Sequence, residues 1–362
     1  MNTDPFKEYI KQSEPNKRDR GYAWHTAIGL QAVDGLKPSE YLIHTAIQNI
    51  EGEISIDEAL ELLNSYYEEN PRVDGDRTEE ADKVSVQIAK ILSEKAFSFT
   101  PNEYISIHKK LFTGIYEHAG KIRDYNITKR EWVLNGATVL YGSASELRAT
   151  LEYDFSEEKK FSYKSLSVDE IVHHLALFVS RLWQIHVFRE GNTRTTAVFF
   201  IKYLRTLGFD TTNDIFAENA WYFRNALVRA NYNDLKNGVH ETTEYLELFL
   251  RNLLLDEKNE LHNRAMHISG VFQSNKKADI EGQKADIREK IEASLPALSE
   301  KTIRHILLMY GKYGNENVFG RSDIEELTGL KSTRVSELLS LLLNAGIIQA
   351  IKGRGKGKYC FY

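Results

Sequence analysis

Residues 167–208, SVDEIVHHLALFVSRLWQIHVFREGNTRTTAVFFIKYLRTLG, decide the fold. Ser167 and Glu170 have the spacing of a capping box, so a helix is expected to begin there and to run toward His186 with one apolar face. The segment after the loop predicts a second, buried helix that ends at Gly208. Two apolar helices would therefore flank one polar loop.

The loop itself, HVFREGNTR at residues 186–194, carries an imidazole, a carboxylate, a glycine, an amide and two guanidinium groups. A glycine-bearing loop that leads into a helix favours anions, because unpaired backbone N–H groups and the helix dipole both attract a phosphate. His186 is expected to accept a proton from an attacking hydroxyl, and Glu190 to hold Mg²⁺. Asn192 and Arg194 are expected to donate hydrogen bonds to phosphate oxygens. The loop therefore contains the parts of a phosphoryl-group transfer.

This loop resembles the signature of the Fic family, His-Pro-Phe-x-(Asp/Glu)-Gly-Asn-(Gly/Lys)-Arg. Upstream, HKKLF at residues 108–112 and AGKIR at residues 119–123 look like the family's introductory helix and its Ala-Gly-x-x-Arg turn. The resemblance spans roughly residues 100–250. It implies a helical catalytic core that uses ATP and Mg²⁺ to transfer AMP to a Ser, Thr or Tyr hydroxyl of a target protein or of the chain itself. Removal of the AMP by the same enzyme stays open.

The resemblance also assigns roles to single residues. It implies that His186 is the base and that Glu190 is the metal ligand. It implies nucleotide binding by Gly191, Asn192, Thr193, Arg194, Thr195, Tyr232 and Asn237. The last two belong to NYNDLKNG at residues 231–238, and without the family they read as a half-buried helix residue and a helix C-cap.

Two positions depart from the family pattern. Val187 stands where proline is usual, which loosens φ at the loop entrance but leaves the chemical groups unchanged. Ala197 stands where many members carry another arginine that holds the terminal phosphate. The preferred nucleotide and the direction of the reaction therefore stay open, with Arg189 as a candidate substitute for the missing guanidinium.

A target-positioning flap and an inhibitory helix are also expected. Strand-like residues surround Asn135-Gly136 in TKREWVLNGATVLYG, residues 128–142, which predicts a short β-hairpin where Fic proteins carry their target-positioning flap. Glu51-Gly52 resembles the end of the family's inhibitory helix, (Ser/Thr)-x-x-x-Glu-(Gly/Asn), although Ile47 replaces its Ser/Thr. A carboxylate there would compete with phosphate for a guanidinium. The alternative is a solvated Glu51 at a helix end, for which Glu51→Gly leaves activity unchanged.

The whole chain is predicted to be mainly α-helical, because apolar residues recur at helical spacing and proline is scarce. Four regions are expected along it. They are an N-terminal helical region with the inhibitory helix at residues 1–78, a Fic catalytic domain at 79–267, a linker or exposed helix at 268–297, and a final domain at 298–362. Within them, ENPRVDGDRTEEAD at residues 69–82 reads as a solvated connection.

The final domain has the pattern of a winged helix-turn-helix. A helix around KTIRHILLMYG, a capping box at Ser322–Glu325 and a helix at Thr333–Asn344 precede two strand-like pieces around a glycine-rich turn. The residues predicted to contact DNA are Arg334, Lys352, Arg354, Lys356 and Lys358. Such modules also dimerise or dock proteins, so a homodimer and a protein partner are open alternatives.

Composition limits the remaining function classes. The net charge of −5 gives no general attraction to nucleic acid, and the single cysteine, Cys360, excludes a disulfide within the chain. The N-terminus is too polar for a secretory signal and no apolar run reaches the length of a membrane span, so we expect a cytoplasmic protein without membrane contact.

Two other function classes compete with the transferase. One is a nucleotide-sensing, DNA-binding transcriptional regulator, which needs phosphate donors but no proton acceptor at His186. The other is metal-dependent phosphodiester hydrolysis, which needs a larger cluster of ligands. His173-His174 is the only adjacent histidine pair, and consecutive helix residues point about 100° apart, so this pair is expected to be structural.

Overall fold

The computed structural model describes residues 6–11, 14–71, 76–211, 215–269, 291, 294–295, 298–313, 318–351 and 357–361. It forms two compact units, Met1–Gly270 and Val271–Tyr362. The protein is mainly helical, as predicted. None of the helices in these ranges combines the length and the apolarity that a membrane span requires.

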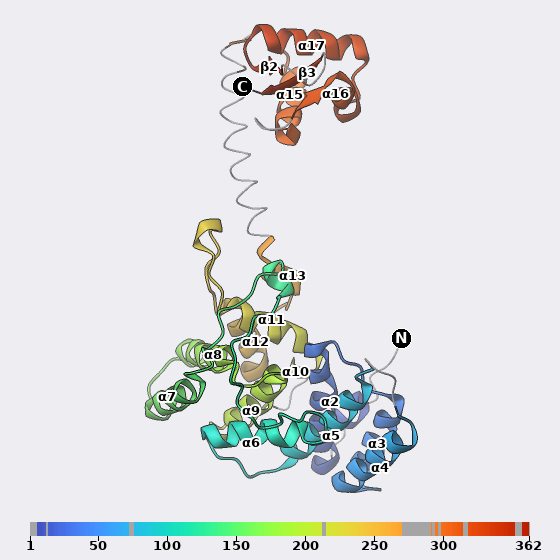
Figure 1. The fold of residues 1–362 in the computed structure, drawn as a ribbon, viewed down its shortest axis with the longest axis vertical. Coiled ribbons are helices and arrows are strands. Elements are labelled where there is room, and N and C mark those ends of the chain that lie inside the picture. The colour runs from blue at the N-terminus through green and yellow to red at the C-terminus, as the bar shows by residue number, and fades with distance from the viewer. Residues whose placement is uncertain are drawn as a thin grey trace. The chain divides into compact units, whose positions relative to one another are not determined.

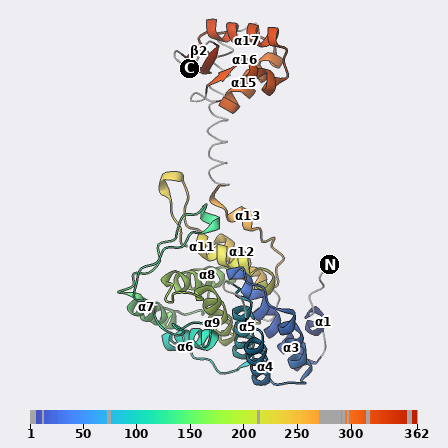
Figure 2. The ribbon, with the colours of Figure 1, turned by 45° about the vertical axis from the view of Figure 1, so that its right-hand side comes forward.

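The first unit begins with a group of helices on one side of the molecule. These elements are α1 (Lys7–Ile10), α2 (Pro15–Gly29), the 3-10 helix η1 (Leu30–Asp34), α3 (Glu40–Glu51), α4 (Ile56–Glu69) and α5 (Thr78–Ser93). The helix end predicted at Gly52 is confirmed, since Gly52 ends α3 with a φ of 84°. Figures 1 and 2 show α2 to α5 together on one side of the unit and α7 and α8 on the other.

The rest of the first unit surrounds the central helix α9. Its elements are α6 (Pro101–Phe112), η2 (Trp132–Leu134), α7 (Leu147–Lys160), α8 (Val168–Ile185), α9 (Asn192–Thr206), α10 (Ile215–Glu218), α11 (Ala220–Arg229), η3 (Leu235–Asn237), α12 (Glu244–Leu255) and α13 (Asn263–Met266). Every residue from Asn192 to Leu204 is buried, and α5, α6 and α8 pack against α9 (Figure 1). The central position of α9 fixes the loop that precedes it.

The capping box of α8 is confirmed. The Ser167 hydroxyl accepts from the Glu170 N–H at 3.3 Å, and the Glu170 carboxylate accepts from the Ser167 N–H at 2.8 Å. The helix after the loop begins at Asn192, directly after Gly191, whose left-handed φ of 75° lets the chain turn into the helix axis. Residues 192–194 are therefore the first turn of α9 and not free loop.

The predicted β-hairpin at residues 128–142 is wrong in its strands. Asn135 and Gly136 do form the tight turn, with φ values of 53° and 86°. The Glu131 N–H donates to the Ala137 carbonyl at 2.9 Å, but the residues before the turn coil into η2 instead of forming a strand. Side-chain hydrogen bonds, described below, hold this segment in place of a strand ladder. We call residues 128–142 the flap segment.

The prediction that residues 69–82 form a solvated connection is also wrong for the last residues of this segment. Helix α5 begins at Thr78, and Glu80 and Asp82 are buried. The Asp82 carboxylate accepts hydrogen bonds from the Ser39 N–H at 2.8 Å and from the Tyr67 hydroxyl at 2.6 Å. These donors offset the cost of burying a charge.

The second unit contains α15 (Glu300–Tyr313), β1 (Phe319–Gly320), α16 (Arg321–Thr328), α17 (Ser332–Asn344), β2 (Ile348–Ala350) and β3 (Lys358–Phe361). The three strands form an antiparallel sheet in the order β1-β3-β2. The core side chains of α15, α16 and α17, including Ile306, Ile324 and Leu342, pack against Phe319 and Phe361 of the sheet. The order of α15, α16, α17, β2 and β3 agrees with the order predicted from the sequence. Strand β1 was not predicted, and α16 begins at Arg321 after the N-cap Gly320, so the capping box predicted at Ser322–Glu325 is wrong.

Candidate active site

His186 ends α8 in a left-handed conformation, with φ 50° and ψ 58°. This backbone geometry is uncommon for a residue with a side chain, and contacts on both sides hold it. The Arg123 Nε donates to the His186 carbonyl at 2.7 Å, and the Arg123 N–H donates to the Val187 carbonyl at 3.0 Å. The Tyr141 ring lies 4.3 Å from the imidazole, centroid to centroid. The ring of His186 is therefore held in one orientation.

The two ring nitrogens of His186 differ in their surroundings. Nδ1 lies 3.4 Å from the Trp183 carbonyl, whereas the buried Nε2 has no hydrogen-bond partner in the described structure. Burial holds the pKa of His186 well below its usual value, and the positive charges of Lys129, Arg224 and Arg123 act in the same direction. A neutral ring whose one proton faces a carbonyl leaves Nε2 as the proton acceptor.

The side chain of Asn192 fixes the turn of the loop by hydrogen bonds to the backbone of Phe188. Its side-chain oxygen accepts from the Phe188 N–H at 2.9 Å, and its side-chain nitrogen donates to the Phe188 carbonyl at 2.7 Å. Gly191 cannot carry a side chain, because a Cβ there would lie 2.3 Å from the Phe112 ring. The predicted phosphate ligand Asn192 thus holds the loop closed with its side chain.

The hydroxyl groups of two further predicted nucleotide ligands form hydrogen bonds with other groups of the protein. Thr193 accepts from the Trp183 indole N–H at 3.0 Å, and Thr195 donates to the Gly191 carbonyl at 2.9 Å. Both side chains are buried. An anion at this helix start would therefore contact the first N–H groups of the backbone, which an α-helix leaves without intrahelical partners.

His108 of α6 supports the loop by hydrogen bonds. The family motif at residues 108–112 did not predict this role. The Nδ1 of His108 accepts from the Gly120 N–H at 2.9 Å, so its Nε2 carries the proton and donates to the Glu190 carbonyl at 3.0 Å. The ring also stacks on Phe188 at 3.7 Å. Burial lowers the pKa of His108 to about 3, which keeps it in this neutral form.

Glu190 is the accessible carboxylate of the loop, with 49% of its side chain exposed. It lies 3.2 Å from the Lys129 ammonium of the flap segment. In the described residues no three His, Cys, Asp or Glu side chains gather as a metal site. A single exposed carboxylate suits Mg²⁺ that takes its remaining ligands from substrate phosphates and water, so the residues present fit such an ion.

Arg194 is buried completely and is held by acidic groups from the N-terminal helices. Its guanidinium forms ion pairs with Glu80 at 2.6 Å and with Asp34 at 2.9 Å, and it donates to the Gln31 side chain at 2.9 Å. Its flat face lies 4.9 Å from the Phe112 ring centre. The arginine predicted to grip a phosphate is thus occupied by carboxylates of the same chain.

The surroundings of Glu80 stabilise its ionised carboxylate. Burial alone would raise its pKa, but hydrogen bonds from Arg77 and Tyr116 and the charge of Arg194 hold the pKa at about 2. Arg77 binds both carboxylate oxygens at 2.8 Å. The carboxylate is therefore ionised and fully bonded near neutral pH.

Glu51, the predicted inhibitory residue, lies elsewhere. It ends α3 and forms an ion pair with Lys17 of α2 at 2.7 Å, with 32% of its side chain exposed. In the described structure no hydrogen bond or ion pair joins it to residues 186–195. The carboxylates that contact the guanidinium of Arg194 are those of Asp34 and Glu80.

Tyr232 and Asn237 lie in a loop that projects from the first unit, seen in yellow in Figure 1. Asn237 donates to the Asp234 carboxylate at 2.7 Å, and Asp234 pairs with Val239 across the loop. Within the described residues no hydrogen bond connects either predicted adenosine contact to the loop at 186–194. Their role in nucleotide binding stays a prediction.

A buried cluster connects the flap segment to His186. Glu131, fully buried, forms an ion pair with Arg224 of α11 at 2.7 Å and accepts from the Tyr141 hydroxyl at 2.9 Å. Tyr141 in turn covers the imidazole of His186. Sequence reasoning missed this cluster, because its members are separated by up to 93 positions and belong to no shared motif.

Comparison with known proteins identifies the domain that holds this site. Residues 98–204 match the model of the Fic/DOC family. Protein adenylyltransferase VbhT of Bartonella schoenbuchensis (strain DSM 13525 / NCTC 13165 / R1) is 30% identical over 103 residues, which cover 28% of this chain and 20% of that protein. A crystal structure of a Fic family protein from Desulfovibrio desulfuricans G20 is 12% identical with a TM-score of 0.43, covering 99% of this chain and 92% of that chain.

The fold and site define a helical protein with a histidine loop at a helix start, and residues 98–204, which contain this loop, match the Fic/DOC family model. The chain spans about a fifth of the length of the curated relative that it matches. The activity of the whole protein is therefore a matter for proposal.

Proposed function

We propose that this protein is a nucleotidyltransferase that moves AMP from ATP to a Ser, Thr or Tyr hydroxyl of a protein target or of the chain itself. The observation that carries the proposal is the buried Nε2 of His186, which has no partner among the described residues and belongs to the loop that leads into α9. The matched relative, named a protein adenylyltransferase, supports the same reaction class.

In this reaction His186 takes the proton of the attacking hydroxyl on Nε2. The hydroxyl oxygen forms a bond to the α-phosphorus, and the bond from this phosphorus to the bridging oxygen breaks, so pyrophosphate leaves with the electron pair. Because the pKa of His186 lies well below its usual value, the ring is an unprotonated acceptor at neutral pH. Tyr141 and Arg123 keep the acceptor aimed at one place.

Glu190 would hold Mg²⁺ together with substrate phosphate oxygens. A bound Mg²⁺ supplies charge neutralisation on the phosphates. The Lys129 ammonium lies 3.2 Å from Oε2 of Glu190, so it would compete with a metal ion for this oxygen. The first backbone N–H groups of α9 supply the remaining anion contacts.

The flap segment is the proposed contact for the target protein. Trp132 and Leu140 are 45% and 84% exposed, although both are large apolar side chains. Exposed apolar groups beside a reactive site suit a protein surface or peptide. The buried pair of Glu131 and Arg224 gives this segment a fixed base.

We propose that the N-terminal helices restrain the enzyme. Asp34 and Glu80 occupy the guanidinium of Arg194, and a phosphate that needs this group must displace them. Glu51, which was predicted for this role, pairs with Lys17 instead. The carboxylates proposed for the restraint are therefore Asp34 and Glu80, and an inhibitory role of Glu51 stays a prediction.

We propose that the second unit is a winged helix-turn-helix domain, on the order of its helices and strands. Of the residues predicted to contact DNA, Lys352, Arg354 and Lys356 lie outside the described residues. Arg334 pairs with Glu337 at 2.8 Å and Lys358 with Asp323 at 3.2 Å. Binding to DNA and homodimer formation stay predictions, as does the cytoplasmic location.

The deciding experiment incubates the wild-type protein and His186→Ala with Mg²⁺, ATP labelled at the α-phosphate, and a cell lysate. Label on protein that depends on His186 supports the proposal. ATP binding without labelling in wild type, Asp34→Asn and Glu80→Gln would instead favour the nucleotide-sensing regulator. A parallel reaction with ATP labelled at the γ-phosphate separates AMP transfer from phosphate transfer.

A further inference from the structure

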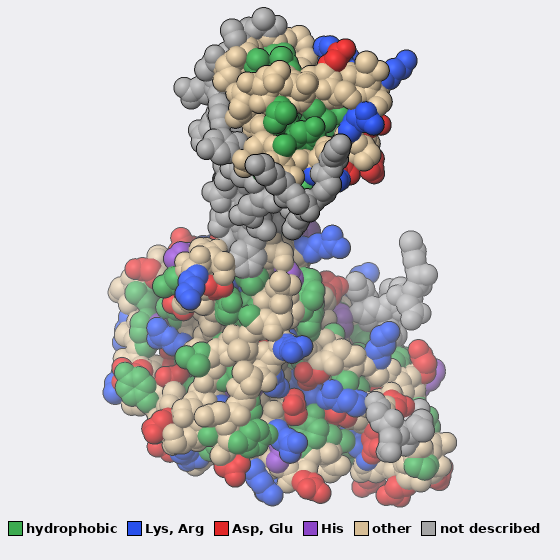
Figure 3. Space-filling model, turned by 45° about the horizontal axis from the view of Figure 1, so that its top comes forward, with side chains coloured by type: hydrophobic (Ala, Val, Ile, Leu, Met, Phe, Trp, Pro, Cys, Tyr) green, Lys and Arg blue, Asp and Glu red, His purple; other side chains and the backbone are tan. Residues whose placement is uncertain are grey.

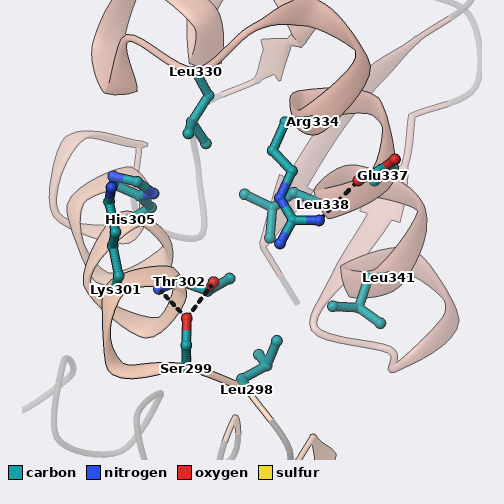
Figure 4. A pocket seen from close by; sticks show the side chains of 10 residues that line it. All are labelled: Leu298, Ser299, Lys301, Thr302, His305, Leu330, Arg334, Glu337, Leu338 and Leu341. Carbon is teal, nitrogen blue, oxygen red and sulfur yellow. Dashed lines mark hydrogen bonds and ion pairs between the residues drawn. The ribbon is translucent and has the colours of Figure 1, made fainter.

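The second unit contains a pocket that the transferase reaction does not use. The cavity, about 360 Å³ in volume, lies between the start of α15 and the face of α17. Its lining residues are Leu298, Ser299, Lys301, Thr302, His305, Leu330, Arg334, Glu337, Leu338 and Leu341. Figure 4 shows the side chains of the two helices facing each other across it.

Leucines form the walls of the pocket, and they differ in how far the core of the unit covers them. Leu338 belongs to the core together with Val335, Leu339 and Leu342 and is 5% exposed, Leu298 and Leu330 pack against this core, and Leu341 is 36% exposed. Figure 3 shows hydrophobic side chains reaching the surface of the second unit beside Lys and Arg side chains. Apolar surface at a concave site gains free energy when an apolar side chain covers it.

The rim of the pocket is positive. Lys301 and Arg334 each carry a permanent positive charge, against the single carboxylate of Glu337, which pairs with Arg334. The start of α15 also lies here, where Ser299 accepts from the Thr302 N–H at 3.3 Å, and a helix N-terminus favours anions. The ligand that complements this pocket is therefore apolar in one part and anionic in another.

This combination does not suit a DNA duplex. The phosphate backbone binds cations, and base edges present hydrogen-bonding groups in grooves, so neither fills a cavity walled by four leucines. Arg334, predicted from the sequence to contact DNA, instead projects into the cavity and bonds to Glu337 (Figure 4).

We propose that this pocket is a docking site for a short acidic segment of another protein. One large apolar side chain of the segment, such as Leu or Phe, enters between Leu338 and Leu341. Neighbouring carboxylates of the segment pair with Lys301 and Arg334 at the rim. Side chains in a pocket and charges on its rim give both affinity and selectivity in peptide recognition. The proposal does not depend on the transferase reaction.

The test uses the full chain and a phage-displayed library of random dodecapeptides. The most enriched peptide is then made with a fluorescein label, and its binding is measured by fluorescence polarisation. The pocket variants are Leu341→Asp and Lys301→Glu. Their controls are Leu343→Asp, on the same helix with 38% exposure, and Arg304→Glu on α15, because neither residue lines the pocket. A short labelled DNA duplex is titrated against all five proteins.

We expect enriched peptides with a large apolar residue next to Asp or Glu. Both pocket variants should weaken peptide binding by at least about tenfold, as expected for contacts at the centre of a pocket, while both controls bind as the wild type does. Thermal melting checks each fold, and Lys301→Glu alone decides if Leu341→Asp does not fold. No enrichment, peptides without this pattern, equal losses in the control variants, or duplex binding that the pocket variants abolish would each overturn the proposal.

Discussion

The two ends of the loop at residues 186–194 differ in how they are bonded. At the first end the Nε2 of His186 is buried without a partner among the described residues, Arg123 bonds to the backbone of His186, and the Tyr141 ring lies against the imidazole. At the second end the guanidinium of Arg194 is surrounded by Asp34, Glu80 and Gln31. The end of the loop at His186, the reactive end, therefore has a free proton acceptor. The end at Arg194, the engaged end, is expected to bind phosphate but is bonded to the N-terminal helices. Under the restraint proposed above, control therefore acts on substrate binding and not on the base.

The largest effect is expected from breaking the reactive end. His186→Ala should lower protein labelling by about 10²- to 10⁴-fold, the usual contribution of a positioned general base. ATP binding, measured by equilibrium dialysis, should change little. Labelling of His186→Ala at the wild-type rate would contradict the role given to Nε2.

The next effect comes from breaking the engaged end. Arg194→Met should lower the free energy of unfolding by about 3 kcal/mol, because removing one partner of a buried ion pair leaves an unpaired charge. The loss should lie near the lower limit for such pairs, since Arg77 still binds Glu80. Urea unfolding followed by circular dichroism gives the value. A loss below about 1 kcal/mol, the range of exposed pairs, would show that Arg194 does not fasten the N-terminal helices.

Gly191→Ala tests the turn that joins the two ends. The new Cβ would collide with the Phe112 ring at 2.3 Å, and the residue would have to keep a φ of 75°. We expect a loss of about 1–3 kcal/mol in the free energy of unfolding and a lower labelling rate. Gly208→Ala is the matched control, because it has a positive φ of 90° but open space around the position of a Cβ.

The histidines near the loop should make stability depend on pH. The pKa values of His186 and His108 are lowered from 6.5 in the folded protein, so below about pH 6.5 the unfolded chain binds more protons than the folded one. Stability should be constant above that pH and fall below it by up to about 1.4 kcal/mol per pH unit for each histidine. Glu80, with its pKa at about 2, adds a further loss below its ordinary value of 4.5.

Urea unfolding at a series of pH values between about 4.5 and 8 separates the histidine part of this dependence. His108→Gln should reduce the slope below pH 6.5, and the same substitution at His44, exposed on α3, serves as the control. An unchanged slope in His108→Gln would contradict the neutral, buried form of His108.

The smallest effect is expected at Glu190. Lys129→Met removes an ion pair between two partly exposed side chains, 27% and 49% exposed, worth at most about 1 kcal/mol. The concentration of Mg²⁺ that gives half-maximal labelling should therefore fall by roughly twofold to fivefold. A higher requirement for Mg²⁺ would instead assign Lys129 to the phosphates.

The sequence was informative where one local signal determines the structure. The capping box at Ser167 and Glu170 and the helix end at Gly52 depend on residues within one or two turns, and both are confirmed. The Asn135-Gly136 turn is present for the same reason. Its flanking strands are absent because Glu131 bonds to distant Arg224 and Tyr141, and no local pattern shows such contacts.

The contacts of Arg194 could not be predicted in the same way. Glu80 belongs to a charged segment that reads as solvated, and only the folded chain brings it within 2.6 Å of a residue 114 positions away. Asp34 lies in a short 3-10 helix without any motif. The loop motif predicted which groups gather at the site, but long-range packing decides which of them are free to bind a ligand.

The most direct test of the role given to His186 is to measure the protonation of its ring by nitrogen NMR of the protein labelled with ¹⁵N-histidine. The His186 signals are assigned by their loss in His186→Gln. We predict that His186 is a neutral ring at pH 7 and remains so when the pH is lowered by about one unit below the ordinary histidine value. Its proton should be on Nδ1, and Nε2 should have the shift of an unprotonated nitrogen. A charged imidazolium, or a proton on Nε2, would contradict the account.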